Sequence, residues 1–429
     1  MTVRLDRPAA GALSPALSPT SGRTGLPVRP ASFAGRALLV AVNLAAAVFF
    51  LLSYTRHGVG FGLYRIDLDV YRIGGRVWLR GGDLYGVLPV TTGGARLPFS
   101  YPPIAAVLLA PLALAPMAVA GTVFTLSSIA LTALVLRVFL RSATLGAGSW
   151  WTVGWLLPVA LFLEPVRNTL NYGQVNVALM ALVSVDCLSA SARWPRGVGV
   201  GLAAAVKLTP AAFVLFFLCR GDRRAALTAA VSFATVTAAD FPLAWHDSVR
   251  YWTSIVFQTG RPGNLIYAAN QSIQAVLGRA GLDPHTPAGT AAWLALSAVV
   301  LVLACSGMRR ALARSEDAWA LSLNAFAALL ISPISWSHHW VWAEPALLVL
   351  AVRGLRDRHV GGLAGCAVGL ALFAAAPQWW FPSGGNREIH WAVWQQVVGS
   401  SYVILAAVIL LLSASGSRVP AFLRCRTAA

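Results

Sequence analysis

Acidic residues are scarce in this chain, which has 15 Asp and Glu in 429 residues against 33 Lys and Arg. Lysine is scarcer still, because Lys207 is the only one. The five cysteines lie in or beside apolar runs without metal-ligand spacing, so they indicate small core residues rather than a disulfide framework. No Gly-rich nucleotide loop and no Ser-His-Asp order occur, which argues against a cytosolic enzyme that uses ATP or a nucleotide sugar.

Long apolar runs dominate what is present. Hydrophobic residues make up 57% of the chain, and runs of about 17–23 apolar residues, each able to span a bilayer, alternate with short Arg-rich or Pro/Gly-rich connections. This pattern predicts an all-α integral membrane protein, a polytopic bundle of about ten to twelve transmembrane helices. The net charge of +18 does not indicate nucleic-acid binding, because the arginines are spread over the ends of the apolar runs, where they orient helices.

Composition divides the chain into three segments. Residues 1–35 are rich in Pro, Ser, Gly and Arg and predict a disordered cytoplasmic tail, 36–413 form the transmembrane domain, and 414–429 form a second cytoplasmic tail. Arginines before the first apolar run place its start in the cytoplasm, so the loop at 55–100 is expected outside. Residues 102–139 hold two short spans, or one span and a re-entrant piece. Further spans are expected at 150–163, 175–192, 197–219, 225–243, 287–307, 319–333, 340–352, 361–379 and 393–413.

The scarcity of acids draws attention to one short polar segment. Asp67 and Asp69 follow the first long apolar run, and carboxylates in a mostly membrane-buried protein are costly unless they are paired, hydrated or used. One could act as a general base on an acceptor hydroxyl, with the other as a supporting or metal-binding group. Alternatively, they are solvated acids at the N-terminus of a short interfacial helix at 70–79. On a helix the two side chains would diverge, whereas an extended segment would place them on one face.

Lys207 lies deep in the apolar run at 197–219, where Lys207-Leu-Thr-Pro210 is expected to break or kink the helix. An ammonium at that depth needs a partner or a water-filled cavity, and a lipid-linked phosphate or a carboxylate of a neighbouring helix would serve. The alternative is a lysine that extends to the cytoplasmic interface.

Two more polar segments lie between apolar spans. Ser335-Trp-Ser-His338-His339-Trp340 contains adjacent histidines, which point in different directions on a helix and so do not make a two-His metal face. One ring could donate to a phosphate or sugar oxygen, or both could pack at the membrane interface. The segment 164–176 offers an ion pair three residues apart, Glu164 with Arg167. Its amides could bind polar ligand groups or satisfy one another in a helix contact: Asn171, Gln174 and Asn176.

Taken together, these segments resemble glycosyltransferase family 87, the polyprenol-phosphate-mannose-dependent α-mannosyltransferases of actinobacteria. The resemblance spans most of the chain and rests on an ordered set of short motifs: Asp67-Leu-Asp-Val-Tyr71, Phe99-Ser-Tyr-Pro-Pro103, Asn171-Tyr-Gly-Gln-Val-Asn176, Ala205-Val-Lys-Leu-Thr-Pro210, Asn270-Gln-Ser272 and Ser332-Pro-Ile-Ser-Trp-Ser-His-His-Trp340.

The resemblance implies a bundle similar to the GT-C glycosyltransferases, a multi-pass protein of the plasma membrane with its site on the extracytoplasmic face. It implies that Asp67 is the catalytic base and that Lys207, with His338 or His339, lies near the donor phosphate. Asp69 takes the variable position of its motif. The remaining substrate-binding candidates come from the other motifs: Tyr101, Asn171, Gln174, Asn176, Asn270 and Gln271.

The implied substrates are a polyprenyl-phosphate-sugar donor and a glycolipid acceptor such as a phosphatidylinositol mannoside, with inversion at the transferred mannose. No cofactor is assigned, and the paired acids leave a divalent metal open. Two alternatives remain. One is a transporter or flippase of lipid-linked sugar that binds the phosphate at Lys207, although no internal repeat is visible. The other is the same type of enzyme with a pentose donor such as arabinose.

Overall fold

A computed structural model describes residues 33–52, 65–144, 148–189, 192–258, 260–261 and 263–416. Both predicted tails fall almost wholly outside these ranges, as does the start of the predicted first loop, at 55–64. Within them the chain is helical, and the only β-type pairing there is an isolated antiparallel bridge between Asn270 and Trp336. The expectation of an all-α architecture is therefore confirmed.

The α-helices and 3₁₀ helices follow one another with short connections. Their bounds are α1 Phe33–Leu52, α2 Ile66–Leu79, α3 Pro103–Leu114, α4 Met117–Ala143, α5 Trp150–Phe162, α6 Glu164–Tyr172, α7 Asn176–Leu188, α8 Val198–Val206, η2 Thr209–Phe213, α9 Val214–Arg220, α10 Arg223–Leu243, α11 Trp245–Thr253, η3 Ile255–Phe257, α12 Ile273–Arg279, α13 Pro287–Leu312, α14 Asp317–Ile331, η4 Ser337–Trp342, α15 Ala343–Arg356, α16 Val360–Ala375, η5 Pro377–Trp379, η6 Arg387–His390, α17 Val393–Gly399 and α18 Ser401–Ser415.

Several of these helices can cross a membrane. Four described segments are long and apolar enough to do so, and α17 with α18 forms a fifth that is bent by 67°. Six shorter apolar helices accompany them, including α3, α7 and α14. The chain is thus a multi-pass membrane protein, and the exact number of crossings stays a prediction. The apolar stretch after residue 101 forms two helices, α3 and α4, with Pro103 as the first residue of α3 as expected.

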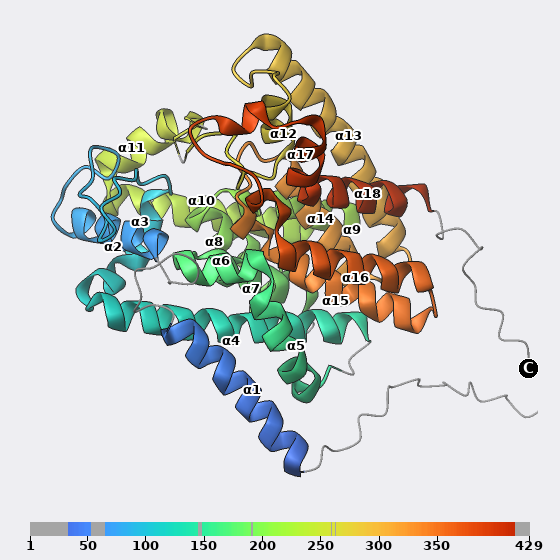
Figure 1. Cartoon of the computed structure of the whole chain (residues 1–429). Helices are drawn as coiled ribbons and strands as arrows, with labels where there is room; N and C mark the ends of the chain where they lie inside the picture. Colours follow the sequence, from blue (N-terminus) through green and yellow to red (C-terminus); the bar gives the residue numbers. More distant parts are fainter. Residues whose placement is uncertain are drawn as a thin grey trace, which may run out of the picture.

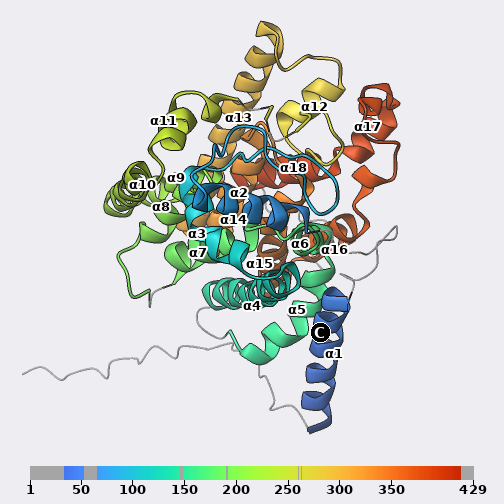
Figure 2. The same cartoon turned by 90° about the vertical axis from the view of Figure 1, so that its left-hand side faces the viewer.

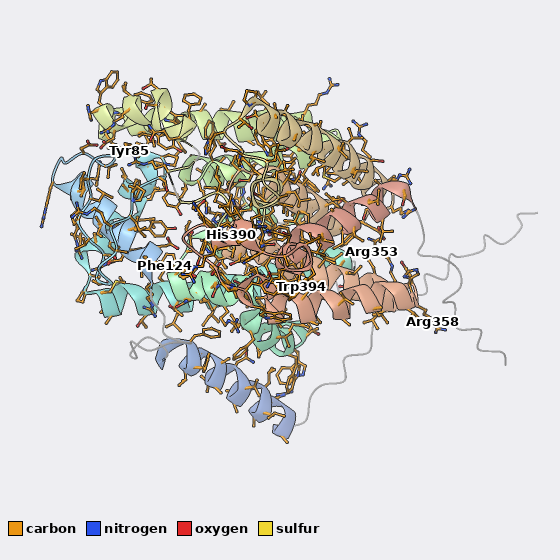
Figure 3. The ribbon with its side chains drawn as sticks, turned by 45° about the horizontal axis from the view of Figure 1, so that its top comes forward. Tyr85, Phe124, Arg353, Arg358, His390 and Trp394 are labelled. Atoms are coloured by element: carbon orange, nitrogen blue, oxygen red, sulfur yellow. The ribbon has the colours of Figure 1, made fainter. Side chains whose placement is uncertain are left out.

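The long helices α4, α15, α16 and α18 run in similar directions through the bundle (Figure 1). At one end of it lie α2, the start of α3 and α11, and Figure 2 looks onto this end with α2 near its centre. Arg353 of α15 and Arg358, two residues after that helix, lie away from this end, as their labels and that of Tyr85 in Figure 3 show.

Helix α2 begins one turn earlier than the amphipathic stretch at 70–79 suggests, and its first turn contains both acids. It packs against α3 through two glycines. A Cβ on Gly74 would lie 2.6 Å from the ring of Phe99, and one on Gly75 would lie 2.8 Å from Cα of Ala110. Arg72 on the same helix donates to the carbonyl oxygens of Leu112 and Ala115 at the end of α3. This contact satisfies carbonyls that the end of α3 leaves without intrahelical partners.

Helix α8 ends at Val206, and Lys207 has extended dihedral angles (φ −148°, ψ 125°) before the 3₁₀ turn η2 begins at Thr209. The predicted interruption at Lys207 is therefore confirmed. At this break the chain leaves the direction of α8 instead of continuing as a single helix. The side chain of Lys207 thereby reaches Asn176 at the start of α7 and His339 in η4.

We expect the close approach of α2 and α3 to tolerate no added methyl group. Gly75→Ala should lower the free energy of unfolding by about 1–3 kcal/mol, because its Cβ meets backbone rather than a movable side chain. Gly365→Ala on α16 is the matched control, since its Cβ would lie 3.5 Å from Leu350 and alanine favours the helix. Thermal unfolding of the purified proteins in detergent measures both; an unchanged midpoint for Gly75→Ala would contradict the packing.

Candidate functional site

Side chains from five separate parts of the chain meet near the α2 end of the bundle. They come from α2, from the segment before α3, from the turn between α6 and α7, from the break after α8, and from η4. This cluster contains most of the residues proposed from the sequence: Asp67, Tyr101, Gln174, Asn176, Lys207, His338 and His339.

Asp67 lies in the first turn of α2, which is not among the apolar spans, and its side chain is partly exposed. Gln174 donates a hydrogen bond to it, and Lys207 is close enough to attract it electrostatically. Removal from water raises the pKa of Asp67 to about 6, although the contacts with Gln174 and Lys207 favour its charged form. A carboxylate with a pKa near neutrality can take up a proton at physiological pH and release it again.

A hydrogen-bonded set of uncharged groups surrounds this carboxylate. The hydroxyl of Tyr71 donates to Oε1 of Gln174 at 2.8 Å, and Nε2 of Gln174 lies 3.2 Å from the hydroxyl of Tyr101. Tyr71 is one helical turn after Asp67, so both reach the same neighbours. These bonds fix the amide of Gln174 so that it presents its N–H groups to Asp67 and Tyr101.

Lys207 has only neutral hydrogen-bond partners in the described part of the chain. Its Nζ donates to Oδ1 of Asn176 at 2.9 Å and lies 3.2 Å from Nε2 of His339. The ammonium also lies 5.6 Å from the centre of the Tyr101 ring, a favourable position for a cation. A cation solvated by dipoles and a ring keeps its attraction for an anion that is not part of the protein.

The 3₁₀ helix η4 presents the two adjacent histidines in different directions, as the sequence predicted. The carbonyl oxygen of His338 accepts hydrogen bonds from Thr169 and Asn176, both at 2.9 Å, which ties η4 to α6 and α7. The ring of His339 faces Lys207. The ring of His338 is buried against Tyr172, 5.1 Å between ring centres, and its Nε2 has no hydrogen-bond partner among the described residues.

A pocket opens beside Lys207, with about 520 Å³ of unfilled space including its mouth. Its polar end contains Asn176, Lys207 and His339. The rest is mainly apolar and is contributed by α7, η2, α14 and η4: Leu179, Met180, Pro210, Phe213, Ala325, Ala328, Leu329, Val341 and Trp342. A cation at one end of an apolar pocket suits a ligand with an anionic group attached to a hydrocarbon chain.

Three of the proposed residues serve the fold instead of the cluster. Asp69 is buried away from Asp67, because helical geometry separates residues two apart. Its carboxylate accepts from the backbone N–H of Thr92 at 2.6 Å and lies 3.8 Å from Arg72. Asn270 binds backbone groups of Leu265, Pro333 and Ser335, and Gln271 donates to carbonyls of Ala268 and Gly399. Asn171 lies at the edge of the cluster, where its backbone carbonyl oxygen accepts a hydrogen bond from the backbone N–H of Arg65.

Glu164 is a buried polar centre whose contacts the sequence did not indicate. Its carboxylate accepts hydrogen bonds from Asn168, from the indole of Trp379 and from the hydroxyl of Tyr402 at 2.6–2.9 Å. The expected short-range pair with Arg167 is only a weaker electrostatic contact. Because its partners are up to 238 residues away, no local spacing reveals this role.

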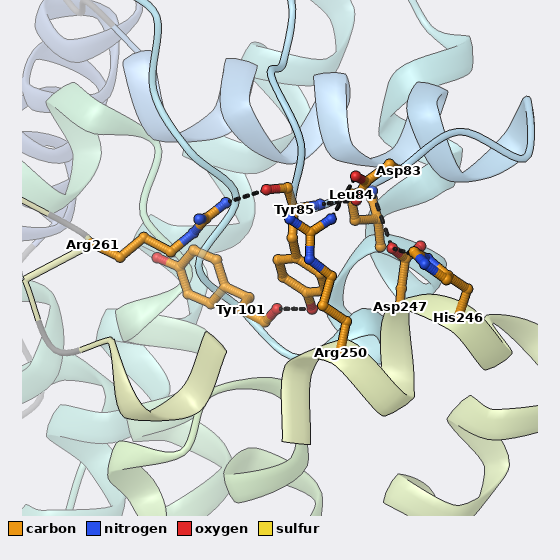
Figure 4. A network of polar contacts seen from close by, with 8 residues as sticks. All are labelled: Asp83, Leu84, Tyr85, Tyr101, His246, Asp247, Arg250 and Arg261. Atoms are coloured by element: carbon orange, nitrogen blue, oxygen red, sulfur yellow. Dashed lines mark hydrogen bonds and ion pairs between the residues drawn. The ribbon is translucent and has the colours of Figure 1, made fainter. Parts of the chain in front are cut away.

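The segment that carries Tyr101 is held in place from outside the cluster (Figure 4). The hydroxyl of Tyr85 donates to the carbonyl oxygen of Tyr101 at 2.8 Å. Arg261 donates to the carbonyl oxygens of Phe99 and Tyr85, while Asp83 pairs with Arg250 of α11. Within the described residues, no group of three or more His, Cys, Asp or Glu is arranged to hold a metal ion.

Comparisons with known proteins give a consistent result. Residues 99–333 match the sequence profile of glycosyltransferase family 87. A polyprenol-phosphate-mannose-dependent alpha-(1-2)-phosphatidylinositol mannoside mannosyltransferase of Mycolicibacterium smegmatis is 40% identical over 83% of this chain and 85% of its own length. Its namesake in Mycobacterium tuberculosis is 39% identical over 89% of this chain and 94% of its own length.

A polyprenol-phosphate-mannose-dependent alpha-(1-2)-phosphatidylinositol pentamannoside mannosyltransferase of Mycobacterium tuberculosis is 32% identical over 78% of this chain and 76% of its own length. No solved structure matches the chain significantly. These matches confirm the family expected from the motifs and the expected class of enzyme, a hexosyltransferase.

The hydrogen bond from Gln174 should control the ionisation of Asp67. Gln174→Leu removes a donor that favours the carboxylate, so we expect the pKa of Asp67 to rise above its value of about 6. Difference infrared spectroscopy of the purified protein across pH 4–9, with Asp67→Asn to assign the carboxyl band, measures it. A carboxyl band that titrates below pH 5 in the wild type, or does not move in Gln174→Leu, would contradict this account.

Proposed function

The chain belongs to glycosyltransferase family 87, and from this premise we propose that it transfers mannose from polyprenyl-phosphate-mannose to a phosphatidylinositol mannoside. The names of the relatives support the two substrates. One observation in this chain carries the proposal: a carboxylate with a raised pKa lies near an ammonium that has only neutral hydrogen-bond partners among the described residues, at the polar end of an apolar pocket. Group transfer from a lipid phosphate needs both a proton acceptor and a cation.

Lys207 and His339 are the proposed contacts of the donor phosphate. The apolar length of the pocket beside them accepts the first isoprene units, which lie next to the phosphate in such a lipid. A polyprenyl phosphate leaves as a stable anion, so its departure needs stabilisation of negative charge more than a proton. The fixed ammonium and the imidazole supply that stabilisation without first giving up an ion pair inside the protein.

Asp67 is the proposed general base. The acceptor hydroxyl oxygen attacks C1 of the mannose, the bond between C1 and the phosphate oxygen breaks, and the hydroxyl proton passes to the Asp67 carboxylate. A single displacement at a β-linked donor gives an α-linked product. A covalent sugar–enzyme intermediate would need a second carboxylate beside the reacting carbon, and Asp69 is directed away from Asp67 toward Thr92 and Arg72.

We place this site on the extracytoplasmic face of the plasma membrane. One observation supports that orientation: Arg353 and Arg358, at and after the end of α15, lie away from the α2 end of the bundle, and basic residues favour the cytoplasmic side. Figure 2 therefore looks onto the face where the acceptor headgroup would be found. Asn171, at the edge of the cluster, is a proposed contact of the substrate on this face.

We expect Asp67→Asn to abolish mannose transfer, with a loss of about 10²–10⁴-fold in kcat, while donor binding persists. Asp283→Asn is the matched control, because Asp283 is an exposed acid of a loop outside the cluster, where it accepts from the N–H of His285. The measurement is transfer by purified protein in lipid with polyprenyl-phosphate-mannose and a phosphatidylinositol mannoside. Full activity of Asp67→Asn would overturn the assignment of Asp67 as the base. Binding of lipid-linked mannose by the wild type without any transfer would favour a transporter.

Replacement of Lys207 tests the phosphate contact. Lys207→Gln keeps a donor of hydrogen bonds but removes the charge, so we expect the KM for the donor to rise by about tenfold or more. The KM for the acceptor should change little. Lys207→Arg keeps the charge and should recover part of the loss. Steady-state kinetics with each substrate varied in turn separates the two effects, and an unchanged donor KM in Lys207→Gln would refute the assignment.

A further inference from the structure

We propose that four aromatic side chains on the far side of His338 from the donor pocket form the binding surface for the acceptor sugar. We call this surface the acceptor wall and define it by Tyr172, Tyr267, Trp336 and Trp379. The inference rests on the proposed function, because it assigns the glycolipid's carbohydrate to a place beside the proposed base. A sugar ring has an apolar face and a rim of hydroxyls, and the wall offers a partner for each.

The rings of the wall form two groups of contacts. Tyr267 lies 6.2 Å from Trp336 and 6.0 Å from Trp379, both edge to face, measured between ring centres. Tyr172 meets His338 edge to face at 5.1 Å. All four side chains of the wall are partly exposed, whereas His338 beside them is buried. The wall is thus accessible on one side and ends at the buried imidazole on the other.

Polar atoms of this surface are available to a ligand. The indole N–H of Trp336 and the hydroxyl of Tyr172 have no hydrogen-bond partner among the described residues, and neither atom is buried. Nε2 of His338 also has no partner in the described part of the chain, but it is buried, so Trp336 and Tyr172 supply the accessible polar atoms. Aromatic faces with nearby unsatisfied donors and acceptors fit a carbohydrate better than a hydrocarbon chain.

The adjacent histidines separate this surface from the donor pocket. His339 contacts Lys207 and lines the pocket, while the His338 ring meets Tyr172. Asp67 is within electrostatic range of both Lys207 and Tyr172. A base that takes a proton from the acceptor while the donor reacts has to be close to both substrates. Asp67 is near one residue of the donor pocket and one residue of the wall, as this requires.

The wall is built on rigid supports. The indole of Trp379 donates to the buried carboxylate of Glu164 at 2.9 Å, and the backbone of Trp336 pairs with that of Asn270. The side chain of Asn270 also accepts from the N–H of Ser335 at 2.9 Å. Rings that are already fixed lose little conformational entropy when a ligand stacks on them. This gives Asn270 and Glu164 a role in the reaction as positioning residues.

Trp336→Leu tests the wall directly, because the Trp336 side chain makes no hydrogen bond within the described protein. We expect the KM for phosphatidylinositol mannoside to rise about tenfold and the donor KM to stay within twofold. Trp336→Phe, which retains a ring, should recover part of the loss. Trp394→Leu is the matched control, since Trp394 is 61% exposed and its ring contact is with Phe381. Thermal unfolding midpoints confirm that each variant is folded.

Binding of the glycolipid, measured by native mass spectrometry without donor, separates this inference from the proposed function. Weaker binding to Trp336→Leu than to wild type supports the wall even if no mannose is transferred, an outcome that would overturn the function alone. Transfer with equal acceptor KM and equal binding in both proteins would overturn the wall and leave the function intact. A donor KM that rises together with the acceptor KM, or a wild type that binds no glycolipid, would also overturn it.

Discussion

A single ammonium inside an apolar bundle is the constraint around which the site is organised. Lys207 has no carboxylate as a hydrogen-bond partner among the described residues, and neighbouring segments provide dipoles instead. Asn176 does so from the start of α7, His339 from η4 and the Tyr101 ring from the segment before α3. The break after α8 is part of the same arrangement, because an uninterrupted helix would carry the lysine in another direction. Charge and helix break thus determine where the pocket acquires its polar end.

Asp69 shows how helix geometry gives neighbouring residues different roles, because side chains two residues apart on a helix point in different directions. Asp67 and Asp69 are separated by one leucine, yet the first is bound by the amide of Gln174 and the second holds Thr92 and Arg72. Arg72 in turn satisfies the end of α3. The pair therefore connects the proposed base to the packing of α2 against α3. A change in that packing would shift Asp67 without any substitution at Asp67 itself.

The sequence predicted the membrane class, the break at Lys207, the start of α3 at Pro103 and the divergence of the histidines. Each depends on a local pattern: run length, a lysine and proline in an apolar run, or adjacent positions on a helix. It did not predict that α2 starts a turn earlier, so the direction of Asp69 remained open. Nor could amide spacing indicate that Asn270 and Gln271 serve backbone groups. The role of Glu164 depends on residues brought together only by the fold.

The hydrogen bond from Tyr402 to Glu164 has a consequence for biogenesis. Tyr402 belongs to α18, which the ribosome makes after every other described helix, whereas Glu164 begins α6. Until α18 has been inserted, the buried carboxylate lacks the hydrogen bond from Tyr402, and Trp340 of η4 lacks its ring contact with Tyr402. A nascent chain that already contains the residues around Lys207 and Asp67 would therefore still lack part of the packing of η4. Such a delay would keep partly inserted chains from holding lipid-linked sugar before the bundle is complete.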